Sequence, residues 1–450
     1  MGKLFGTDGV RGIANKELTP ELAYKLGRVG AYELLKDNKN TKAKVVIGKD
    51  TRRSGDLLET AMAAGFLSMG IDVISLGVIP TPAVAYLIRH LKADCGVVIS
   101  ASHNPAEYNG IKFFDHRGYK LPDEMEAEIE GYILRNEDVP TRPTGADIGV
   151  LTHYNAAGDE YINFLKSTVK RDFKGLKIAM DTGNGAAYLL APKLFRELGA
   201  EVFVVNEEPN GLNINFNCGS THPEVVQKLV EETNAHVGIT FDGDADRAIA
   251  VNEKCQIVDG DHIMAICGSK LKKHNVLKND TIVATVMSNI GLELCMKDFG
   301  CQVAKTKVGD RYVLEEMIKN NYSLGGEQSG HIIFLDYNTT GDGLLTALQL
   351  VDTIVEEEKP FSVLSSMMTS YPQVLVNAKV KNENKDGYLK DEEIIAEIKR
   401  IEDHLAGKGR VLIRPSGTEP LVRVMLEGQN QEELNHLATE LAKMIEEKLS

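Results

Sequence analysis

Three stretches of the chain repeat one pattern that restricts it to an α/β fold. Each begins with a short apolar run, continues through a polar turn and a helical segment, and reaches a glycine just before the next apolar run. The first residues of these runs and the glycines that follow are Val45 and Gly70, Ile178 and Gly199, and Ile282 and Gly300. The order strand, helix, glycine cap and strand is typical of a βαβ unit in a parallel sheet. Because the glycines are separated by domain-sized intervals, we predict three related α/β domains rather than a short-period repeat.

The length of 450 residues exceeds what one hydrophobic core supports, which agrees with several domains. Residues 140–149 contain Pro140, Pro143 and Gly145 and have the composition of a connector. A second boundary follows the apolar run that ends at Val251, and a third lies near Pro372. We therefore expect α/β domains over residues 1–152, 153–252 and 253–369, and a smaller C-terminal α+β domain over residues 370–450.

Charge and cysteine usage restrict the partners and the compartment. A net charge of −14 argues against a general nucleic-acid surface, so an anionic ligand must be met by arginines and lysines in particular loops. The six cysteines include no C-x-x-C pair. The first residues lack the apolar core of a signal peptide, and the uncharged stretch 73–88 contains two prolines and is too short to cross a bilayer. We expect a cytoplasmic protein with reduced cysteines and no nucleic-acid or membrane partner.

Residues 100–105, Ser-Ala-Ser-His-Asn-Pro, follow directly on the apolar run 96–99. Small hydroxyl residues, a histidine and an Asn-Pro turn at the end of a buried strand lie at a sheet edge, where ligands of α/β proteins bind. Ser102 is the candidate nucleophile because His103 is beside it and Lys112 interrupts the next apolar run. Desolvation can lower the pKa of such a lysine so that it takes or supplies a proton. The alternative is a purely structural turn, since these residue types are common in turns.

Three carboxylates alternate in residues 241–247, Phe-Asp-Gly-Asp-Ala-Asp-Arg. Two such charges about 4 Å apart repel by roughly 4 kcal/mol at an effective dielectric of 20. The turn must therefore splay Asp242, Asp244 and Asp246 into water or hold a cation, and oxygen ligands point to a hard ion such as Mg²⁺. We reject a calcium EF-hand because Arg247 stands where that loop needs glycine and a strand is expected to follow. A merely solvated acidic loop remains the alternative.

Three further loops combine glycine with polar side chains. Residues 414–420, Arg-Pro-Ser-Gly-Thr-Glu-Pro, with Arg423 close behind, have the composition of a phosphate cradle, although a Pro-Gly hairpin turn is the simpler interpretation. Residues 325–331, Gly-Gly-Glu-Gln-Ser-Gly-His, could bind the hydroxyls of a sugar. Residues 5–12 place Arg11 in a glycine-rich loop. Two arginines near residue 417 in an acidic chain favour an anion there.

Together these loops resemble those of the α-D-phosphohexomutase family. The serine, carboxylate, 326–331 and 414–423 segments are similar to the family's phosphoserine, magnesium, sugar-binding and phosphate-binding loops. They occur in the family's order, one in each expected domain. Within the family, Gln328 and the segments 213–215, 217–222 and 308–312 resemble the amino-sugar branch. Because some relatives carry histidine where Asp310 stands, no acid/base role is transferred to that position. The resemblance implies four domains around a central cleft.

The resemblance also implies roles for individual residues. Ser102 would carry the phosphoryl group, and its phosphate oxygen would complete a single Mg²⁺ site with Asp242, Asp244 and Asp246. Arg11, Arg247 and His103 would assist the transfer, and Lys112 would act as general base. Substrate-binding roles fall on Glu327 and Ser329 for the ring hydroxyls and on His331 of the same loop. They also fall on Arg414, Ser416, Gly417, Thr418 and Arg423 for the phosphate that is not reacting.

The implied reaction interconverts glucosamine 6-phosphate and glucosamine 1-phosphate through a 1,6-bisphosphate that turns end over end, and supplies the synthesis of UDP-N-acetylglucosamine. Glucosamine 1,6-bisphosphate or glucose 1,6-bisphosphate would act as activator. The alternatives are a mutase acting on neutral hexose phosphates, a metal-dependent phosphatase with Ser102 as nucleophile, and a catalytically silent phosphosugar-binding protein. A serine hydrolase is disfavoured because the chain contains no Gly-x-Ser-x-Gly elbow. The oligomeric state is left open, with a homodimer among the alternatives.

Overall fold

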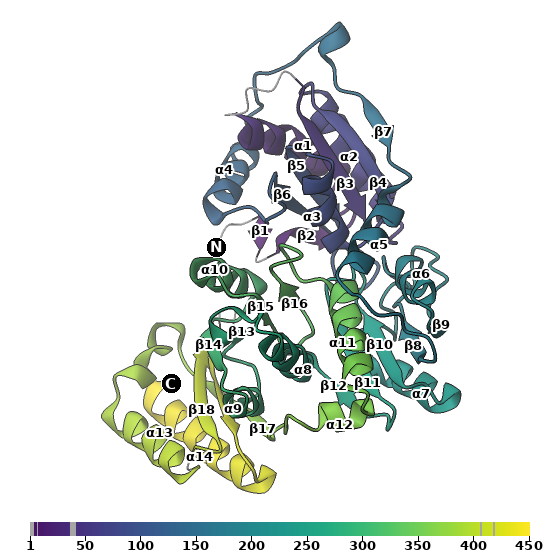
Figure 1. Ribbon diagram of the computed structural model, residues 1–450. Helices are drawn as coiled ribbons and strands as arrows, with labels where there is room; N and C mark the ends of the chain where they lie inside the picture. The colour runs from purple at the N-terminus through teal and green to yellow at the C-terminus, as the bar shows by residue number, and fades with distance from the viewer. Residues whose placement is uncertain (1–3, 7, 37–41, 406, 417–418) are drawn as a thin grey trace. The chain divides into compact units, whose positions relative to one another are not determined.

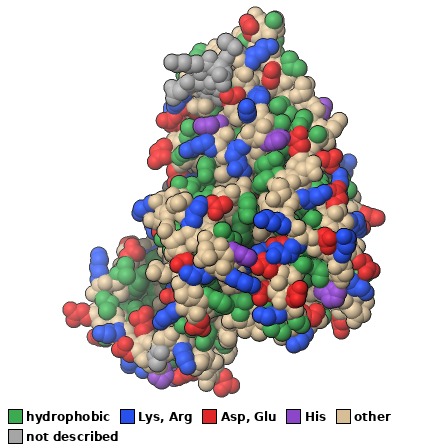
Figure 2. All heavy atoms as spheres, in the orientation of Figure 1, with side chains coloured by type: hydrophobic (Ala, Val, Ile, Leu, Met, Phe, Trp, Pro, Cys, Tyr) green, Lys and Arg blue, Asp and Glu red, His purple; other side chains and the backbone are tan. Residues whose placement is uncertain are grey.

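The structure is a computed structural model that describes residues 4–6, 8–36, 42–405, 407–416 and 419–450 (Figure 1). The chain forms two compact units, one comprising Met1–Met287 with Cys301–Met367 and the other Ser288–Gly300 with Met368–Ser450. Among the described residues, no helix is long and apolar enough to cross a membrane. Side chains of both charges are intermixed over the face in Figure 2.

The first α/β domain is built on a mixed seven-stranded sheet with the order β1-β2-β6-β5-β3-β4-β7. Its elements are β1 (Phe5–Gly6), β2 (Gly9–Ile13), α1 (Pro20–Leu35), β3 (Lys44–Lys49), α2 (Ser54–Leu67), β4 (Asp72–Val78), α3 (Thr81–His90), β5 (Cys95–Ile99), β6 (Tyr108–Asp115), α4 (Asp123–Leu134) and β7 (Leu151–His153). β3 runs parallel to β4 and β5, whereas β6 runs antiparallel to β5 and β2. The carboxyl end of β5 therefore delivers the serine loop to an edge of the sheet.

Helices cover both faces of this sheet. α1, α2 and α4 pack with Ile47, Val97 and other buried side chains in one apolar cluster. α3 packs on β3 and β5, where a Cβ on Gly96 would meet Ile88 Cδ1 at 2.4 Å. The glycine therefore allows the helix to approach the strand closely. The resulting helix–sheet–helix layering confirms the α/β class expected from the sequence.

The second and third α/β domains have smaller mixed sheets, with the orders β12-β11-β10-β8-β9 and β14-β13-β15-β16. The elements of these two domains are α5 (Ala157–Ser167), β8 (Lys177–Asp181), α6 (Leu190–Glu197), β9 (Glu201–Val205), α7 (Pro223–Thr233), β10 (Val237–Phe241), β11 (Ala248–Asn252), β12 (Ile257–Val258), α8 (Gly260–Lys273), β13 (Thr281–Thr285), β14 (Gln302–Thr306), α10 (Asp310–Asn320), β15 (Leu324–Gly326), β16 (Ile332–Phe334), α11 (Gly343–Glu357) and α12 (Phe361–Ser365). In each sheet a parallel pair matches the predicted βαβ unit. The carboxylate turn joins antiparallel β10 and β11.

The C-terminal unit has a three-stranded antiparallel sheet with the order β17-β19-β18. Its elements are α9 (Ile290–Asp298), β17 (Gln373–Lys379), α13 (Glu392–His404), β18 (Arg410–Pro415), β19 (Leu421–Glu427) and α14 (Gln431–Leu449). Among the described residues, short 3₁₀ helices occupy Gly145–Asp147, Lys278–Asp280, Asn382–Asn384 and Gly387–Leu389. α13 and α14 bury their apolar faces against the sheet. This agrees with the small α+β domain expected at the C-terminus.

Strand pairing differs in detail from the expected segment limits. β7 includes His153 and pairs with β4, so the first sheet extends one residue past 152. β12 pairs with β11, so the second sheet extends past 252. Residues 288–300 group with the C-terminal unit instead of the third domain. The reason is local, because Ile290 N–H donates to the Glu427 carboxylate at 3.1 Å. The domain limits themselves remain predictions.

The three glycines that mark the repeats have the conformation that their position requires. Gly70, Gly199 and Gly300 have φ of +82°, +94° and +70°, just after α2, α6 and α9. A left-handed residue after a helix turns the chain toward the next strand, and glycine adopts it without a Cβ penalty. The sequence pattern therefore identified real helix ends.

Asp342 anchors the buried helix α11, which contacts elements of both the second and the third domain. One carboxylate oxygen accepts from Leu345 N–H at 2.9 Å and from the Tyr161 hydroxyl at 2.7 Å, and the other accepts from Asn338 Nδ2 at 3.0 Å. We expect Asp342→Ala to lower the free energy of unfolding by about 2–4 kcal/mol, since it removes a helix cap and leaves two buried donors unpaired. Tyr161→Phe, which loses one bond, should cost about 1 kcal/mol. Urea unfolding followed by circular dichroism measures both, and equal stabilities would contradict the expectation.

Candidate active site

The serine loop holds Ser102 in a strained and buried position. Ser102 is 2% exposed and has a left-handed φ of +51°, which a non-glycine residue adopts only where its surroundings hold it. Its N–H donates to Ser100 Oγ at 3.0 Å. Its Oγ donates to Asp242 Oδ2 at 2.7 Å. The candidate nucleophile therefore touches the carboxylate turn, 140 residues further along the chain.

His103 makes a longer contact with the Ser102 hydroxyl than Asp242 does. Its Nδ1 lies 3.5 Å from Ser102 Oγ, at the limit of a hydrogen bond. Burial, together with the positive charges of Arg247 and Arg11, lowers the pKa of His103. The imidazole is therefore neutral near pH 7 but distant, whereas the Asp242 carboxylate makes the short contact.

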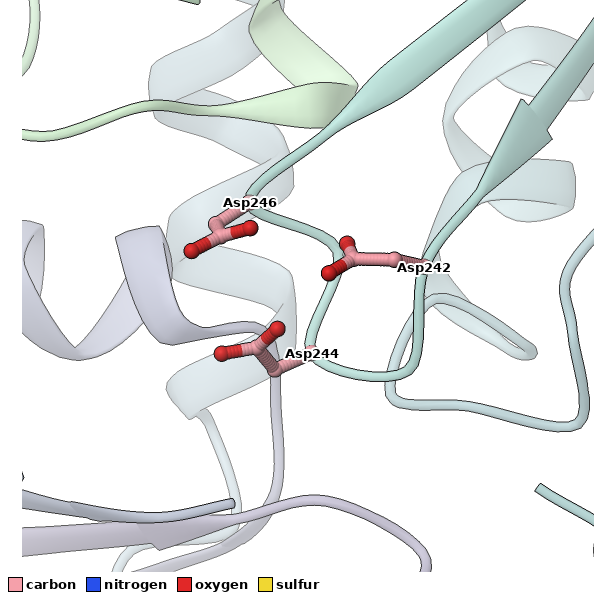
Figure 3. Close-up of side chains that lie close together, drawn as sticks. All are labelled: Asp242, Asp244 and Asp246. Carbon is pink, nitrogen blue, oxygen red and sulfur yellow. The ribbon is translucent and has the colours of Figure 1, made fainter. Parts of the chain in front are cut away.

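The three carboxylates of the turn point toward one another (Figure 3). Asp242 follows the end of β10, and Asp246 lies just before β11. One oxygen from each of Asp242, Asp244 and Asp246 lies within 4.8 Å of the others. The three residues are 0%, 1% and 4% exposed, so the solvated acidic surface loop is ruled out. A strand, β11, follows the turn, and this agrees with rejection of an EF-hand.

The charge of this cluster fits a hard divalent cation. Burial and the charges of Asp246 and Asp244 raise the pKa of Asp242 well above its usual value. Within the described part of the chain, Asp244 Oδ1 and Asp246 Oδ1 are buried without a hydrogen-bond partner. Buried carboxylate oxygens without partners are costly unless they bind a cation. Oxygen-only ligation from one tight turn suits Mg²⁺.

Arg11 on β2 and Arg247 after the turn bring positive charge to the site. Arg11 forms an ion pair with Asp8, and Arg247 Nε lies 3.8 Å from Asp246 Oδ1. Burial alone would lower the pKa of Arg247, but Asp246 and Asp242 outweigh it and raise the pKa. Among the described residues, neither guanidinium Nε has a hydrogen-bond partner. Both side chains therefore retain donors for an anionic ligand.

The pKa of Lys112 is raised, although desolvation by itself lowers it. Lys112 lies on β6 and is 1% exposed, and its Nζ contacts Asp8 Oδ2 at 2.9 Å and Asp244 Oδ2 at 3.0 Å. Burial favours the neutral amine, but the carboxylates of Asp244, Asp8 and Asp246 outweigh it and raise the pKa. Lys112 is therefore a charged partner of the carboxylate turn in this structure.

A second network of ion pairs at the site was not predicted from the sequence. Lys120 Nζ lies 2.5 Å from both Asp8 Oδ1 and Asp310 Oδ2. His331 Nε2 lies 3.7 Å from Asp310 Oδ2, and His331 Nδ1 lies 3.5 Å from Asp246 Oδ2. His331, which was expected to bind substrate, is thus buried between two carboxylates. Burial alone would lower the pKa of His331, but these carboxylates raise it. Nothing local to Asp8 or Lys120 in the sequence signals this network, because its members come from distant segments.

The 325–331 loop lies beside the carboxylate turn. Ala248 N–H donates to Gly330 O at 3.1 Å, and a Cβ on Gly330 would meet that alanine's carbonyl oxygen at 2.2 Å. Glu327 is half-buried and accepts from Gly309 N–H at 3.2 Å, whereas Ser329 is exposed. Gln328 Nε2 donates to Asp259 Oδ2 at 3.1 Å, at the start of α8. The loop therefore brings Glu327 to the same end of the sheets as the carboxylates.

The described residues of the 414–423 segment lie in the C-terminal unit, where Arg414 on β18 and Arg423 on β19 are paired across two antiparallel strands. Ser416 is buried, and its Oγ accepts from Glu419 N–H at 3.2 Å. Arg414 Nη1 is buried without a partner among the described residues. Gly417 and Thr418 lie outside the described residues. The described residues thus place two arginines on paired strands, and the turn between the strands stays a prediction.

Profiles of one family match the chain from end to end. They are described as phosphoglucomutase/phosphomannomutase alpha/beta/alpha domain I at residues 2–139, domain II at 159–256, domain III at 259–371 and the C-terminal domain at 375–444. Curated relatives include the phosphoglucosamine mutases of Alkaliphilus oremlandii, 71% identical, and Clostridioides difficile, 60% identical; each alignment covers 100% of both chains.

Solved structures share the fold at lower identity. A phosphoglucomutase/phosphomannomutase family protein from Burkholderia thailandensis is 24% identical with a TM-score of 0.82, and the match covers 100% of this chain and 99% of that one. The N-acetylphosphoglucosamine mutase of Aspergillus fumigatus, in complex with GlcNAc-6P and magnesium, is 18% identical with a TM-score of 0.69, and the match covers 100% and 96%. At these identities the likeness concerns the fold.

Proposed function

Because the chain belongs to the phosphoglucomutase/phosphomannomutase family, we propose that it interconverts glucosamine 6-phosphate and glucosamine 1-phosphate, the activity named for relatives 60–71% identical over their full length. The observation that carries this proposal is the contact of Ser102 Oγ with Asp242, which joins the serine loop to the carboxylate turn. A serine hydroxyl at a cluster of buried carboxylates is the arrangement expected of a phosphoryl carrier.

The proposed reaction has two balanced transfers. In the first, the O1 hydroxyl of glucosamine 6-phosphate bonds to phosphorus of phosphorylated Ser102, and the bond from phosphorus to Oγ breaks. The hydroxyl proton leaves the sugar, and Ser102 regains a hydroxyl. In the second transfer, after the 1,6-bisphosphate has reoriented, Ser102 Oγ loses its proton and bonds to the phosphorus at O6. The bond from that phosphorus to O6 breaks, and O6 takes up a proton to become the hydroxyl of glucosamine 1-phosphate. Glucosamine 1,6-bisphosphate or glucose 1,6-bisphosphate would act as activator by phosphorylating free Ser102.

Asp242, Asp244, Asp246 and a phosphoserine oxygen would hold Mg²⁺, which when bound withdraws charge from the phosphoryl group. Arg11 and Arg247 would stabilise negative charge on the phosphoryl oxygens during transfer, because both carry unpaired donors at the site. Lys112 remains the candidate proton-transfer residue. Its ion pairs with Asp8 and Asp244 keep the amine charged, so the general-base role requires a proton to leave it first.

Substrate recognition is divided between two loops in this proposal. Glu327 and Ser329 would bind ring hydroxyls, supported by the position of their loop beside the carboxylate turn. His331 of the same loop is buried between Asp246 and Asp310, so it is not assigned to the hydroxyls. Arg414, Ser416, Gly417, Thr418 and Arg423 would bind the phosphate that is not reacting. A single anion site of this kind serves both orientations of the bisphosphate, because either phosphate presents the same charge and oxygens.

Magnesium affinity should fall as pH falls, starting above the usual range of an aspartate. Since the pKa of Asp242 is raised by burial and by its neighbours, a proton competes with the ion at pH values where an exposed aspartate is already ionised. We expect up to a tenfold rise in Kd for each pH unit below that pKa. Titration calorimetry from pH 8 to pH 5 measures the trend, and buffers of different ionisation enthalpy count the protons released. A Kd that is independent of pH would contradict the competition.

Turnover of two substrates on the pure protein tests the proposed activity. We expect conversion of glucosamine 6-phosphate, with Mg²⁺ and glucose 1,6-bisphosphate present, to exceed that of glucose 1-phosphate by kcat/KM. A reversed preference would support the neutral hexose phosphate branch. Steady release of inorganic phosphate without formation of a sugar isomer would support a phosphatase. Binding of the sugar phosphate with no turnover and no phosphate on Ser102 would support a catalytically silent phosphosugar-binding protein.

A further inference from the structure

Two backbone carbonyls of the serine loop are each held by two side chains, buried Arg52 and partly buried Asn215. Arg52 Nη2 donates to Ser102 O at 3.1 Å and to Asn104 O at 2.5 Å. Asn215 Nδ2 donates to the same two oxygens at 2.8 and 3.1 Å. Each carbonyl oxygen thus receives two hydrogen bonds, which uses both of its lone pairs.

Contacts within the first domain hold the side chain of Arg52 in place. Arg52 is 3% exposed, forms an ion pair with buried Asp50, and donates its N–H to Asp50 Oδ1 at 2.9 Å. Asp50 in turn follows β3, and its N–H donates to Ile99 O at 3.1 Å. The guanidinium is therefore tied to the end of β5, the strand that delivers Ser102. Asp50 balances the charge of the guanidinium through Nη1, so the two hydrogens of Nη2 can bridge the two carbonyls.

The Asn215 side comes from the second domain. Asn215 has a left-handed φ of +57°, and its N–H donates to Gly183 O at 2.9 Å. Gly183 N–H and Gly219 N–H both donate to buried Asp181 at the end of β8, at 2.9 and 2.8 Å. Asn215 belongs to the 213–215 segment, which resembled the amino-sugar branch but had no role in the proposed reaction. The structure places its amide on the serine loop.

The carboxylate turn packs against the same contacts. A Cβ on Gly243 would lie 2.6 Å from Ser102 O and 2.8 Å from Asn215 Nδ2. Any side chain at position 243 would therefore displace either the serine loop or the asparagine. Close packing at Gly243 thus joins the carboxylate turn to both the serine loop and Asn215.

The geometry points to Arg52 and Asn215 as positioning residues for phosphoryl transfer. Neither bonds Ser102 Oγ; both fix the carbonyls of Ser102 and of Asn104, two residues further along the loop, so that the left-handed backbone at Ser102 directs Oγ to Asp242. Loss of the amide would leave the loop free to relax out of its strained conformation, since strain persists only where the surroundings enforce it. This inference rests on the proposed function, because the positioned atom matters only if Ser102 carries phosphate.

The chain offers a matched control for Asn215. Asn217 lies in the same loop, has a left-handed φ of +51° and is exposed. Glycine fits a left-handed backbone, so Asn215→Gly and Asn217→Gly both remove an amide without strain. We expect Asn215→Gly to lower kcat on the order of 10- to 100-fold with KM changed less than about threefold, because small misplacement of a reacting group costs rate more than binding. Asn217→Gly should match the wild-type protein in both constants.

Hydrogen exchange of residues 100–104, followed by mass spectrometry without ligand, gives a readout that does not depend on activity. We expect faster exchange in Asn215→Gly than in the wild type or Asn217→Gly, with cooperative thermal unfolding of all three proteins. Arg52→Lys keeps the charge beside Asp50 but loses the bridging fork, so it should show the same pattern; if it fails to fold, Asn215→Gly alone decides.

The outcomes separate this inference from the proposed function. If the wild type interconverts the sugar phosphates and Asn215→Gly matches it in kcat and in exchange, the positioning role is wrong. Faster exchange with unchanged kcat would also overturn it, because the loop would then be held without consequence for transfer. If the wild type shows no phosphoryl transfer, the proposed function fails, while the exchange rates still test the contacts themselves.

Discussion

Replacement of Ser102 by alanine should abolish turnover, with a loss of at least about 10⁴-fold in kcat, because the variant lacks the hydroxyl that would carry the phosphoryl group. The fold should remain intact, since the side chain contributes a single hydrogen bond to Asp242. Intact-mass analysis after exposure to glucose 1,6-bisphosphate should show a phosphate adduct on the wild type and none on Ser102→Ala. Residual activity close to wild type would refute Ser102 as the nucleophile.

Two companion variants make this result specific. Ser102→Gly fits the left-handed backbone at φ of +51° without strain, so its inactivity cannot be attributed to misfolding. His103→Gln keeps the serine but removes the imidazole at 3.5 Å. We expect His103→Gln to retain the phosphate adduct and to lose far less activity, because Asp242 makes the shorter contact with Oγ.

Replacement of Asp244 by asparagine should lower both magnesium affinity and rate, with a loss of about 10²- to 10³-fold in kcat/KM. The substitution removes one of three carboxylates that would bind the ion, and it also removes the ion pair to Lys112 at 3.0 Å. Calorimetric titration with Mg²⁺ and steady-state kinetics at several Mg²⁺ concentrations measure the two effects. Unchanged titration curves would exclude the carboxylate turn as the metal site.

Thr81→Val provides the matched control for Asp244. The Thr81 hydroxyl donates to the same oxygen, Asp244 Oδ2, at 2.7 Å and is fully buried. Valine preserves the shape and leaves the carboxylate charge in place, so magnesium affinity should change by less than about tenfold. A loss in Thr81→Val equal to that in Asp244→Asn would show that the hydrogen bond, and not the charge, is what the site requires.

The sequence was most informative where chemistry is concentrated in one short segment. The carboxylates at 242, 244 and 246 face one another because a single tight turn between two strands joins them. Ser102 could be selected because the turn that carries it follows directly on a buried strand. The βαβ pattern likewise depends on local rules of strand, helix and glycine cap, so it predicted the α/β class.

The sequence was least informative where distant segments meet. Asp8, Lys112 and Asp244 form one ion-pair cluster, although 132 residues separate the last two. The pKa of Lys112 depends on the sum of burial and of charges from these segments, and that sum raises it although burial alone would lower it. No periodicity or composition contains that sum, because it is set by how the domains pack.

Short-range patterns in the sequence thus determined the class of fold, the carboxylate turn and the serine to which the reaction is assigned. Tertiary packing alone decided which charges surround that serine and how its loop is held, as Arg52 and Asn215 illustrate from two different domains. The physical reason is the distance along the chain between the interacting residues. Turns and helix caps act over a few residues, whereas hydrogen bonds and Coulomb interactions between segments a hundred residues apart exist only once the sheets have brought them within a few ångströms.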